Sequence, residues 1–253
     1  MVAKSFVCCL VAVCFAVTGC ETIKPEQVAD NLNVVTPEGA GPFPVVIMYE
    51  GTGGMTSREP RWAGWLKGMG IASAIVGNAG IRGRAKNPNG SMYHEDGAIA
   101  WDILKADTRI DTSRFALIGF SRGGGMALKA GGHFGGKRAV PDFVFAFYPS
   151  GFGRAECSSN HADSTEVHIF FGDKDDVGLV DGLLDACYST ARWNDSVFYH
   201  ELKDTTHGYD YERGSAFTCC NPVTKVRVER NEDAVAYTKS VIEKAIRARW
   251  QGR

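Results

Sequence analysis

The chain has 253 residues, of which 44% are hydrophobic and 23% are charged, and its formal net charge is −1. This is the composition of an ordinary globular protein that can bury one sizeable core, and it lacks the excess of basic charge that nucleic-acid binding requires. No internal repeat, low-complexity tract or second Gly-rich linker divides the chain. We therefore expect a single folded domain over residues 42–253.

The N-terminal residues form a segment of their own. Lys4 precedes an apolar run over residues 6–17, which is too short to cross a bilayer as a mature helix and is typical of a secretory signal. The run ends in Val-Thr-Gly-Cys at 17–20, which resembles the lipobox of bacterial lipoproteins. We expect residues 1–19 to be a signal peptide and Cys20 to carry the lipid, with an ordinary signal peptide cut nearby as the alternative.

The segment after Cys20 is polar and punctuated by Pro and Gly, so residues 20–41 are expected to form a tether between membrane and domain. The protein would then be anchored by its lipid in the bacterial cell envelope, facing the periplasm or the cell surface. Glu21 at the position after the cysteine resembles outer-membrane rather than inner-membrane sorting.

Strand and helix patterns alternate along the rest of the chain. Short apolar runs typical of buried strands lie at residues 44–49, 71–77, 115–120, 143–148, 166–171 and 196–202. Helical patterns lie at residues 57–69, 94–107, 122–132, 178–191 and 231–249. This alternation predicts an α/β fold with a mostly parallel central sheet of at least six strands and helices on both faces. In such folds ligands bind beyond the carboxyl ends of the strands.

Ser121 is the candidate nucleophile. It is the centre of a GxSxG pentapeptide at 119–123, which follows the strand pattern at 115–120 and opens into a segment of small residues. A serine in a sharp strand-to-helix turn presents its hydroxyl to solvent, and flanking glycines remove the Cβ atoms that would clash across the turn.

A serine hydroxyl needs a base, and the base needs a group that orients it. His207 follows the strand pattern at 196–202. The turn after the strand pattern at 166–171 carries three carboxylates, Asp173, Asp175 and Asp176. The chain order Ser, Asp, His is that of α/β-hydrolases and differs from the orders in the chymotrypsin and subtilisin folds.

Three segments resemble the sites of the dienelactone hydrolase family of the α/β-hydrolase superfamily. They are Gly-Phe-Ser-Arg-Gly-Gly from 119, Gly-Asp-Lys-Asp-Asp from 172 and Thr-His-Gly-Tyr-Asp from 206. The resemblance implies an α/β-hydrolase fold with Ser121, His207 and Asp175 as the triad, since Asp175 lies three residues after Gly172, a common spacing in the superfamily. The namesake enzymes have a cysteine nucleophile, so a general ester hydrolase is expected rather than a specific lactone hydrolase.

The resemblance also implies an oxyanion hole. The amide of Arg122, the residue after the nucleophile, is one expected donor, and Gly51 or Thr52 supplies the other. Tyr49 and Glu50 stand where the superfamily usually has a histidine, as in the dienelactone hydrolases, and are candidate substrate contacts. A phosphate-binding loop is the alternative for this Gly-rich turn, but no GK[ST] follows it.

Arg82 follows a strand end and is a further candidate substrate contact, because a guanidinium can hold a carboxylate through two hydrogen bonds. The alternative is an arginine that is solvated or ties two loops together.

Four cysteines of the domain permit three full disulfide pairings and agree with export: Cys157, Cys187, Cys219 and Cys220. Zinc is the competing use of cysteines, but without CxxC or HExxH no metal is expected, and no cofactor either.

Only residues 149–165 separate two successive strand patterns, which leaves no room for a large cap domain. A shallow or loop-covered site favours a small or accessible ester as the partner. We expect a serine hydrolase that cleaves a carboxylic ester or lactone through an acyl-enzyme. The alternatives are an acyltransferase or peptidase on the same triad, and a non-catalytic binding lipoprotein. Neither the substrate nor the oligomeric state follows from the sequence.

Overall fold

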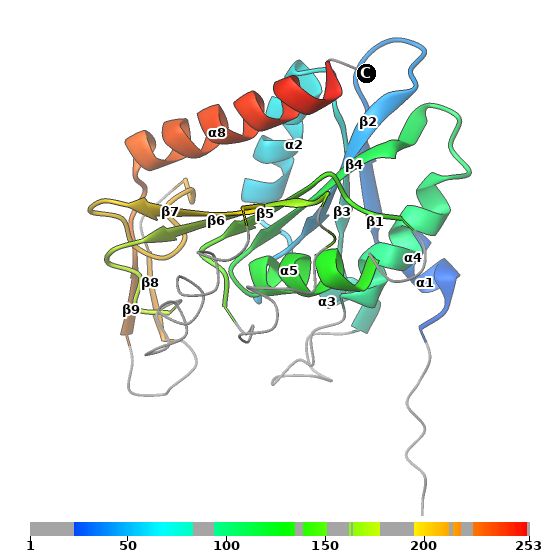
Figure 1. Ribbon diagram of the computed structural model, residues 1–253. Coiled ribbons are helices and arrows are strands. Elements are labelled where there is room, and N and C mark those ends of the chain that lie inside the picture. Colours follow the sequence, from blue (N-terminus) through cyan, green and yellow to red (C-terminus); the bar gives the residue numbers. More distant parts are fainter. Residues whose placement is uncertain are drawn as a thin grey trace, which may run out of the picture.

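The computed structural model describes residues 23–82, 94–134, 139–150, 162, 164–177, 195–212, 215–218 and 225–251. One sheet runs through the middle of the molecule (Figure 1). Its strands are β1 (Leu32–Val35), β2 (Phe43–Tyr49), β3 (Ala72–Val76), β4 (Ile110–Phe120), β5 (Phe143–Phe147), β6 (Glu166–Gly172) and β7 (Val197–Leu202). Their spatial order is β1-β3-β2-β4-β5-β6-β7. A separate pair is formed by β8 (Ser215–Thr218) and β9 (Lys225–Val228).

Strands β2 to β7 all run parallel to one another. The six strands and the mostly parallel sheet predicted from the sequence are therefore confirmed. Only β1 runs the other way, with Leu32 opposite Val76 on β3. Since parallel strands end at the same edge, the loops after β2, β4, β6 and β7 meet on one side of the sheet.

The predicted tether is wrong for residues 25–35. Pro25–Ala29 form the short helix α1 and Leu32–Val35 form β1, which completes the edge of the sheet beside β3. The strand is only four residues long and partly exposed, so it lacks the continuous apolar run that marks the other strands. The predicted signal peptide and the lipidated Cys20 lie outside the described residues.

Helices pack on both faces of the sheet (Figure 1). One face is covered by α2 (Arg58–Gly68) and α8 (Glu232–Trp250), and the other by α4 (Glu95–Leu104) and α5 (Arg122–Phe134). A short helix, α3 (Asn78–Arg82), follows β3. The predicted helix at 178–191 lies outside the described residues. In the part of the chain that the structure describes, no helix has the length and apolar character needed to cross a membrane.

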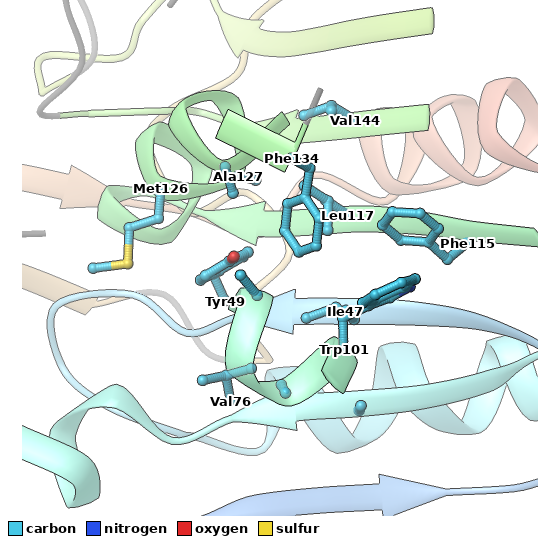
Figure 2. Close-up of a cluster of buried hydrophobic side chains, with 14 of the residues drawn as sticks. Ile47, Tyr49, Val76, Trp101, Phe115, Leu117, Met126, Ala127, Phe134 and Val144 are labelled. Carbon is cyan, nitrogen blue, oxygen red and sulfur yellow. The ribbon is translucent and has the colours of Figure 1, made fainter. Parts of the chain in front are cut away.

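The two cores follow from the alternation of side chains along each strand. On β2, Val45 and Ile47 point into the core under α4 and α5, and Val46 and Met48 point into the core under α2 and α8. Figure 2 shows the first core, where Trp101 of α4 packs against strand side chains that include Ile47, Phe115 and Leu117. Each large apolar side chain buried in this way contributes about 1.5–3 kcal/mol. The rigid sheet fixes the loops at its carboxyl edge.

Candidate active site

Ser121 occupies a sharp turn between strand and helix. β4 ends at Phe120 and α5 begins at Arg122, so the serine is the whole connection. Its φ is +55°, in the left-handed region that costs a non-glycine residue about 1–2 kcal/mol. Its N–H donates to the carbonyl of Phe147, 2.9 Å away, and its carbonyl accepts from the N–H of Gly124, 2.8 Å away. The turn predicted from the GxSxG motif is therefore present, and the surrounding backbone holds its strained residue in place.

The two glycines of the motif are required by close packing. A Cβ atom at Gly119 would overlap the carbonyl oxygen of Gly123, and one at Gly123 would overlap the carbonyl oxygens of Tyr49 and Glu50. Neither position can take a side chain unless the backbone moves. The motif thus brings the turn, the start of α5 and the end of β2 into direct contact.

The structure brings Ser121, His207 and Asp175 together from three different loops. The imidazole Nε2 of His207 lies 2.8 Å from Ser121 Oγ, and Nδ1 lies 3.0 Å and 2.9 Å from the two carboxylate oxygens of Asp175. Asp175 is in the turn after β6, and His207 is in the loop after β7. Asp175 has no exposed surface and His207 is 3% exposed, so their interaction is little screened by water.

The other two acids of the turn have different environments. Asp173 accepts a hydrogen bond from the N–H of Thr205 at 3.0 Å, which ties the turn after β6 to the loop of His207. Asp176 is exposed. Of the three carboxylates, Asp175 is the one that faces the imidazole, as the resemblance implied.

Solved structures with this architecture cover most of the chain. MGS-M1, an α/β-hydrolase enzyme from a Medee basin deep-sea metagenome library, is similar with a TM-score of 0.58 and 15% identity, over 85% of this chain and 92% of that one. The dienelactone hydrolase-like promiscuous phosphotriesterase P91 from metagenomic libraries has a TM-score of 0.60 and 15% identity, over 84% and 96%. The carboxylesterase Cest-2923 from Lactobacillus plantarum has a TM-score of 0.59 and 15% identity, over 84% and 90%.

This chain has the α/β-hydrolase fold. The predicted fold class is thereby confirmed, both by the six parallel strands and by these neighbours. No protein-family model matches the sequence, and no curated protein matches it either. At identities of 15% the likeness concerns the fold, and the chemistry has to be argued from this chain's own residues.

An α/β-hydrolase places its oxyanion hole between the amide after the nucleophile and the loop after an early strand. Arg122 begins α5, so its amide lies in the first helical turn, where the helix dipole favours negative charge. Gly51 lies close to the nucleophile, because a Cβ built on it would lie 3.8 Å from Ser121 Cβ. Thr52 is exposed in a turn closed by the hydrogen bond from Gly54 N–H to Gly51 O, at 3.0 Å. Gly51 is thus a neighbour of the nucleophile turn.

The predicted substrate contacts are not equivalent. Tyr49 has no exposed surface, and its hydroxyl donates to the carbonyl of His94 at 2.9 Å. Burial, with Asp96 nearby, raises the pKa of Tyr49 above its usual value, so this hydroxyl keeps its proton. The structure therefore gives Tyr49 a core position instead of the predicted substrate contact. Glu50 is 4% exposed and accepts a hydrogen bond from the N–H of Ala79 at 2.6 Å.

Arg82 is engaged by another side chain. Its Nη2 lies 2.6 Å and its Nε 3.2 Å from the two carboxylate oxygens of Asp96, which is fully buried. This pair joins α3 to α4. Arg82 therefore matches the alternative interpretation of the sequence, in which the arginine ties two segments together. A substrate carboxylate at Arg82 would have to compete with Asp96.

A cavity of about 800 Å³ opens at the carboxyl edge of the sheet next to Glu50. Glu50 is bonded directly to Gly51, so the cavity borders the Gly51 loop, the candidate for the oxyanion hole. Its wall combines the start of β1 with the turns after β2 and β3, including Asp30, Asn33, Met55 and Gly77. Residues 30–34, which were predicted to be tether, therefore form part of a cavity beside the candidate site.

Two residues behind the triad escaped prediction. The ring of Tyr148 packs edge-on against the imidazole of His207, with ring centres 4.7 Å apart, and the Tyr148 hydroxyl accepts a hydrogen bond from Arg58 Nη1 at 3.0 Å. Arg58 sits in an amphipathic helix pattern where an arginine is usually solvated, and no local signal shows that it is 1% exposed. In the described part of the chain, no three His, Cys, Asp or Glu side chains gather into a group that could hold a metal ion.

Proposed function

We propose that the protein is a serine hydrolase that cleaves a carboxylic ester through an acyl-enzyme. The observation that carries this proposal is the continuous line of hydrogen bonds from Ser121 through His207 to Asp175. The α/β-hydrolase fold and the sharp strand-to-helix turn on which the half-buried serine stands support it. Nucleophile, base and orienting acid are each within the 2.6–3.2 Å reach that proton transfer needs.

In the proposed reaction Ser121 Oγ attacks the acyl carbon while His207 Nε2 accepts its proton. His207 then donates this proton to the leaving alcohol, and in the second half it activates the water that releases the acid. Asp175 stabilises the imidazolium that forms between the steps, and its burial strengthens that interaction. The amides of Arg122 and Gly51 are the donors that we assign to the developing oxyanion.

The substrate class follows from the surroundings of the nucleophile. The site lies at the sheet edge next to a broad, open cavity, whose lining mixes acidic and amide side chains with the apolar side chains of Leu32, Val34 and Met55. Such a wall suits a small or accessible ester better than a long acyl chain, which needs a deep apolar tunnel.

We also propose that Cys20 anchors the protein in the bacterial cell envelope. Metabolic labelling with a palmitate analogue would test this, since the wild type should be labelled and Cys20→Ala should not.

The proposal is tested with short- and long-chain p-nitrophenyl esters in rapid-mixing kinetics. We expect a burst of p-nitrophenol, an acyl adduct on Ser121 by intact mass, and kcat/KM values that fall from acetate or butyrate to decanoate. Added alcohol acceptors separate a hydrolase from an acyltransferase, since a transferase gives mostly transfer product at low acceptor concentration. Turnover that survives in Ser121→Ala, or its absence from the folded wild type, would refute the assignment.

A further inference from the structure

A buried polar network lies directly behind the triad. Arg58 and Glu59 at the start of α2, Tyr148 after β5 and Asp210 after the His207 loop are all at most 2% exposed. Tyr148 Oη accepts from Arg58 Nη1 at 3.0 Å and donates to Asp210 Oδ1 at 2.6 Å. Arg58 also forms an ion pair with Glu59. The Asp210 carboxylate is held from its other side by Trp62 Nε1 at 2.7 Å.

Stability alone is a weak explanation for this network. Buried charges lose their hydration, and well-packed apolar side chains of similar volume often stabilise a fold equally well or better. Burial and the neighbouring Asp210 raise the pKa of Tyr148 well above its usual value, so the hydroxyl stays protonated and can donate to Asp210. Each member is satisfied in one arrangement, which fixes the network in space.

Tyr148 connects this network to both reactive side chains. Its ring stands edge-on to the His207 imidazole, at 4.7 Å between centres. Two residues along, the N–H of Ser150 donates to the Ser121 carbonyl at 3.0 Å, and Ser150 Oγ lies 3.5 Å from Ser121 Oγ. Tyr148 itself has a φ of +36°, which a residue with a side chain adopts only where its surroundings impose it. Tyr148 therefore holds its ring against the imidazole from a backbone conformation that its surroundings impose.

Arg58 connects the same network to the oxyanion loop. A Cβ built on Gly51 would lie 3.2 Å from Arg58 Nη2, so the guanidinium fills the space behind this glycine. The guanidinium also lies 4.4 Å from the ring centre of Phe120, the residue before the nucleophile, and 4.8 Å from that of Tyr211. One buried cation thus touches the Gly51 loop, the nucleophile turn and the hydroxyl of Tyr148.

We propose that Tyr148 and Arg58 are positioning residues, which hold the His207 imidazole and the Gly51 loop in register with Ser121, and that Asp210 anchors them. Neither residue has to touch the substrate. The role as positioning residues for catalysis rests on the proposed serine hydrolase function, whereas the restraint on His207 can be measured without turnover.

The test compares Tyr148→Phe with Tyr209→Phe. Both tyrosines have no exposed surface, and their rings pack against each other with centres 5.4 Å apart, but the Tyr209 hydroxyl is bonded to Thr238 of α8 at 2.8 Å, whereas the Tyr148 hydroxyl is bonded to Arg58 and Asp210. In Tyr148→Phe we expect kcat to fall about tenfold with KM within about twofold, because a small misplacement of the base slows chemistry more than binding. Tyr209→Phe, which loses one hydrogen bond to a neutral group, is expected to remain folded and to keep wild-type kcat.

Histidine ¹⁵N NMR provides the readout that does not depend on activity. The wild type should show a sharp low-field Nδ1–H resonance, assigned to His207 by its loss in His207→Gln, and Tyr148→Phe should broaden or shift it while Tyr209→Phe leaves it in place. Arg58→Lys, which keeps the charge but not the planar fork, should behave like Tyr148→Phe. An unchanged resonance and kcat in Tyr148→Phe, or equal losses in Tyr209→Phe, would overturn the proposal. A resonance that responds in a protein without turnover would support the restraint on His207 and refute the hydrolase assignment.

Discussion

The imidazole Nδ1 of His207 faces both carboxylate oxygens of Asp175, at 3.0 Å and 2.9 Å. A ring nitrogen that faces a carboxylate does so as a donor, so this contact selects the tautomer that carries its proton on Nδ1. Nε2 is then the acceptor that points at Ser121 Oγ, 2.8 Å away. The pair thus gives the imidazole the tautomer that its proposed role as base requires.

Replacing Asp175 by Asn should lower kcat by about 10³- to 10⁴-fold, because the amide favours the other tautomer and cannot stabilise the imidazolium. The fold should persist, since Asn fills the same volume. Steady-state kinetics on a short-chain ester, with circular dichroism as the check on folding, measures the effect. Asp176→Asn, in the same turn but exposed, is the matched control and should keep wild-type kcat. Similar losses in both variants would show that the turn matters as a whole and not its contact with His207.

Gly123→Ala should destabilise the protein by more than about 2 kcal/mol, because the new methyl would overlap the carbonyl oxygens of Tyr49 and Glu50. Urea unfolding followed by tryptophan fluorescence measures the difference. Gly64→Ala is the control: Gly64 lies exposed in α2 with open space around its Cβ position, and alanine there should stabilise by about 0.5–1 kcal/mol. A Gly123→Ala variant as stable as the wild type would contradict the close packing of the turn.

His200 should make the fold acid-sensitive. Burial, with His168 beside it, lowers the pKa of His200 to about 4, whereas the unfolded chain has a histidine pKa of about 6.5. The unfolded state therefore binds more protons between these values. The stabilising contribution is complete above pH 6.5 and is lost as the pH falls toward 4. It amounts to about 1 kcal/mol, well below the full shift, because the ring is partly exposed and screened.

His200→Phe tests this directly. Phenylalanine keeps the ring stacking on Phe170, where the centres are 4.6 Å apart, and removes the titrating nitrogens that contact His168 and Tyr237. The free energy of unfolding at pH 7, 5.5 and 4.5 should fall less steeply in the variant than in the wild type. Parallel slopes would mean that His200 titrates alike in the folded and unfolded states.

Asn231 should stabilise both α8 and the loop of His207. Its Oδ1 caps the helix by accepting from Ala234 N–H at 3.1 Å, and its Nδ2 donates to Thr205 Oγ1 at 2.8 Å, two residues before His207. Asn231→Ala should cost about 1–2 kcal/mol, and Asn231→Asp, which keeps the cap but not the donor, should cost less. Thermal unfolding of the three proteins measures this order, and equal stability of all three would refute both roles.

Much of the fold was predictable because its strands are buried on both sides. β2, β5, the second half of β4 and most of β6 are buried runs of mainly apolar residues, which a linear pattern shows directly. The short edge strand β1 was missed, since two of its four residues are exposed and its place beside β3 depends on a long-range pairing. An edge strand without an apolar run looks like a linker in sequence.

The candidate site, like the fold, was predictable only in part. Ser121, Asp175 and His207 each follow a recognisable strand, so motif and order were enough to expect their meeting. Tyr148 and Arg58 are ninety positions apart and carry ordinary local patterns, and their hydrogen bond exists only because α2 and β5 pack together. Sequence periodicity reports the environment of one element, whereas a buried contact between two elements depends on the whole fold.

The central claim is that Ser121 is an activated nucleophile, and its reaction with a fluorophosphonate probe tests this most directly. The purified domain and its Ser121→Ala variant would be treated with the probe at neutral pH and examined by intact mass and peptide mapping. We predict one adduct on Ser121 in the wild type and none in the variant. A folded wild type that does not react, or a variant that reacts equally, would show that Ser121 is not an activated nucleophile.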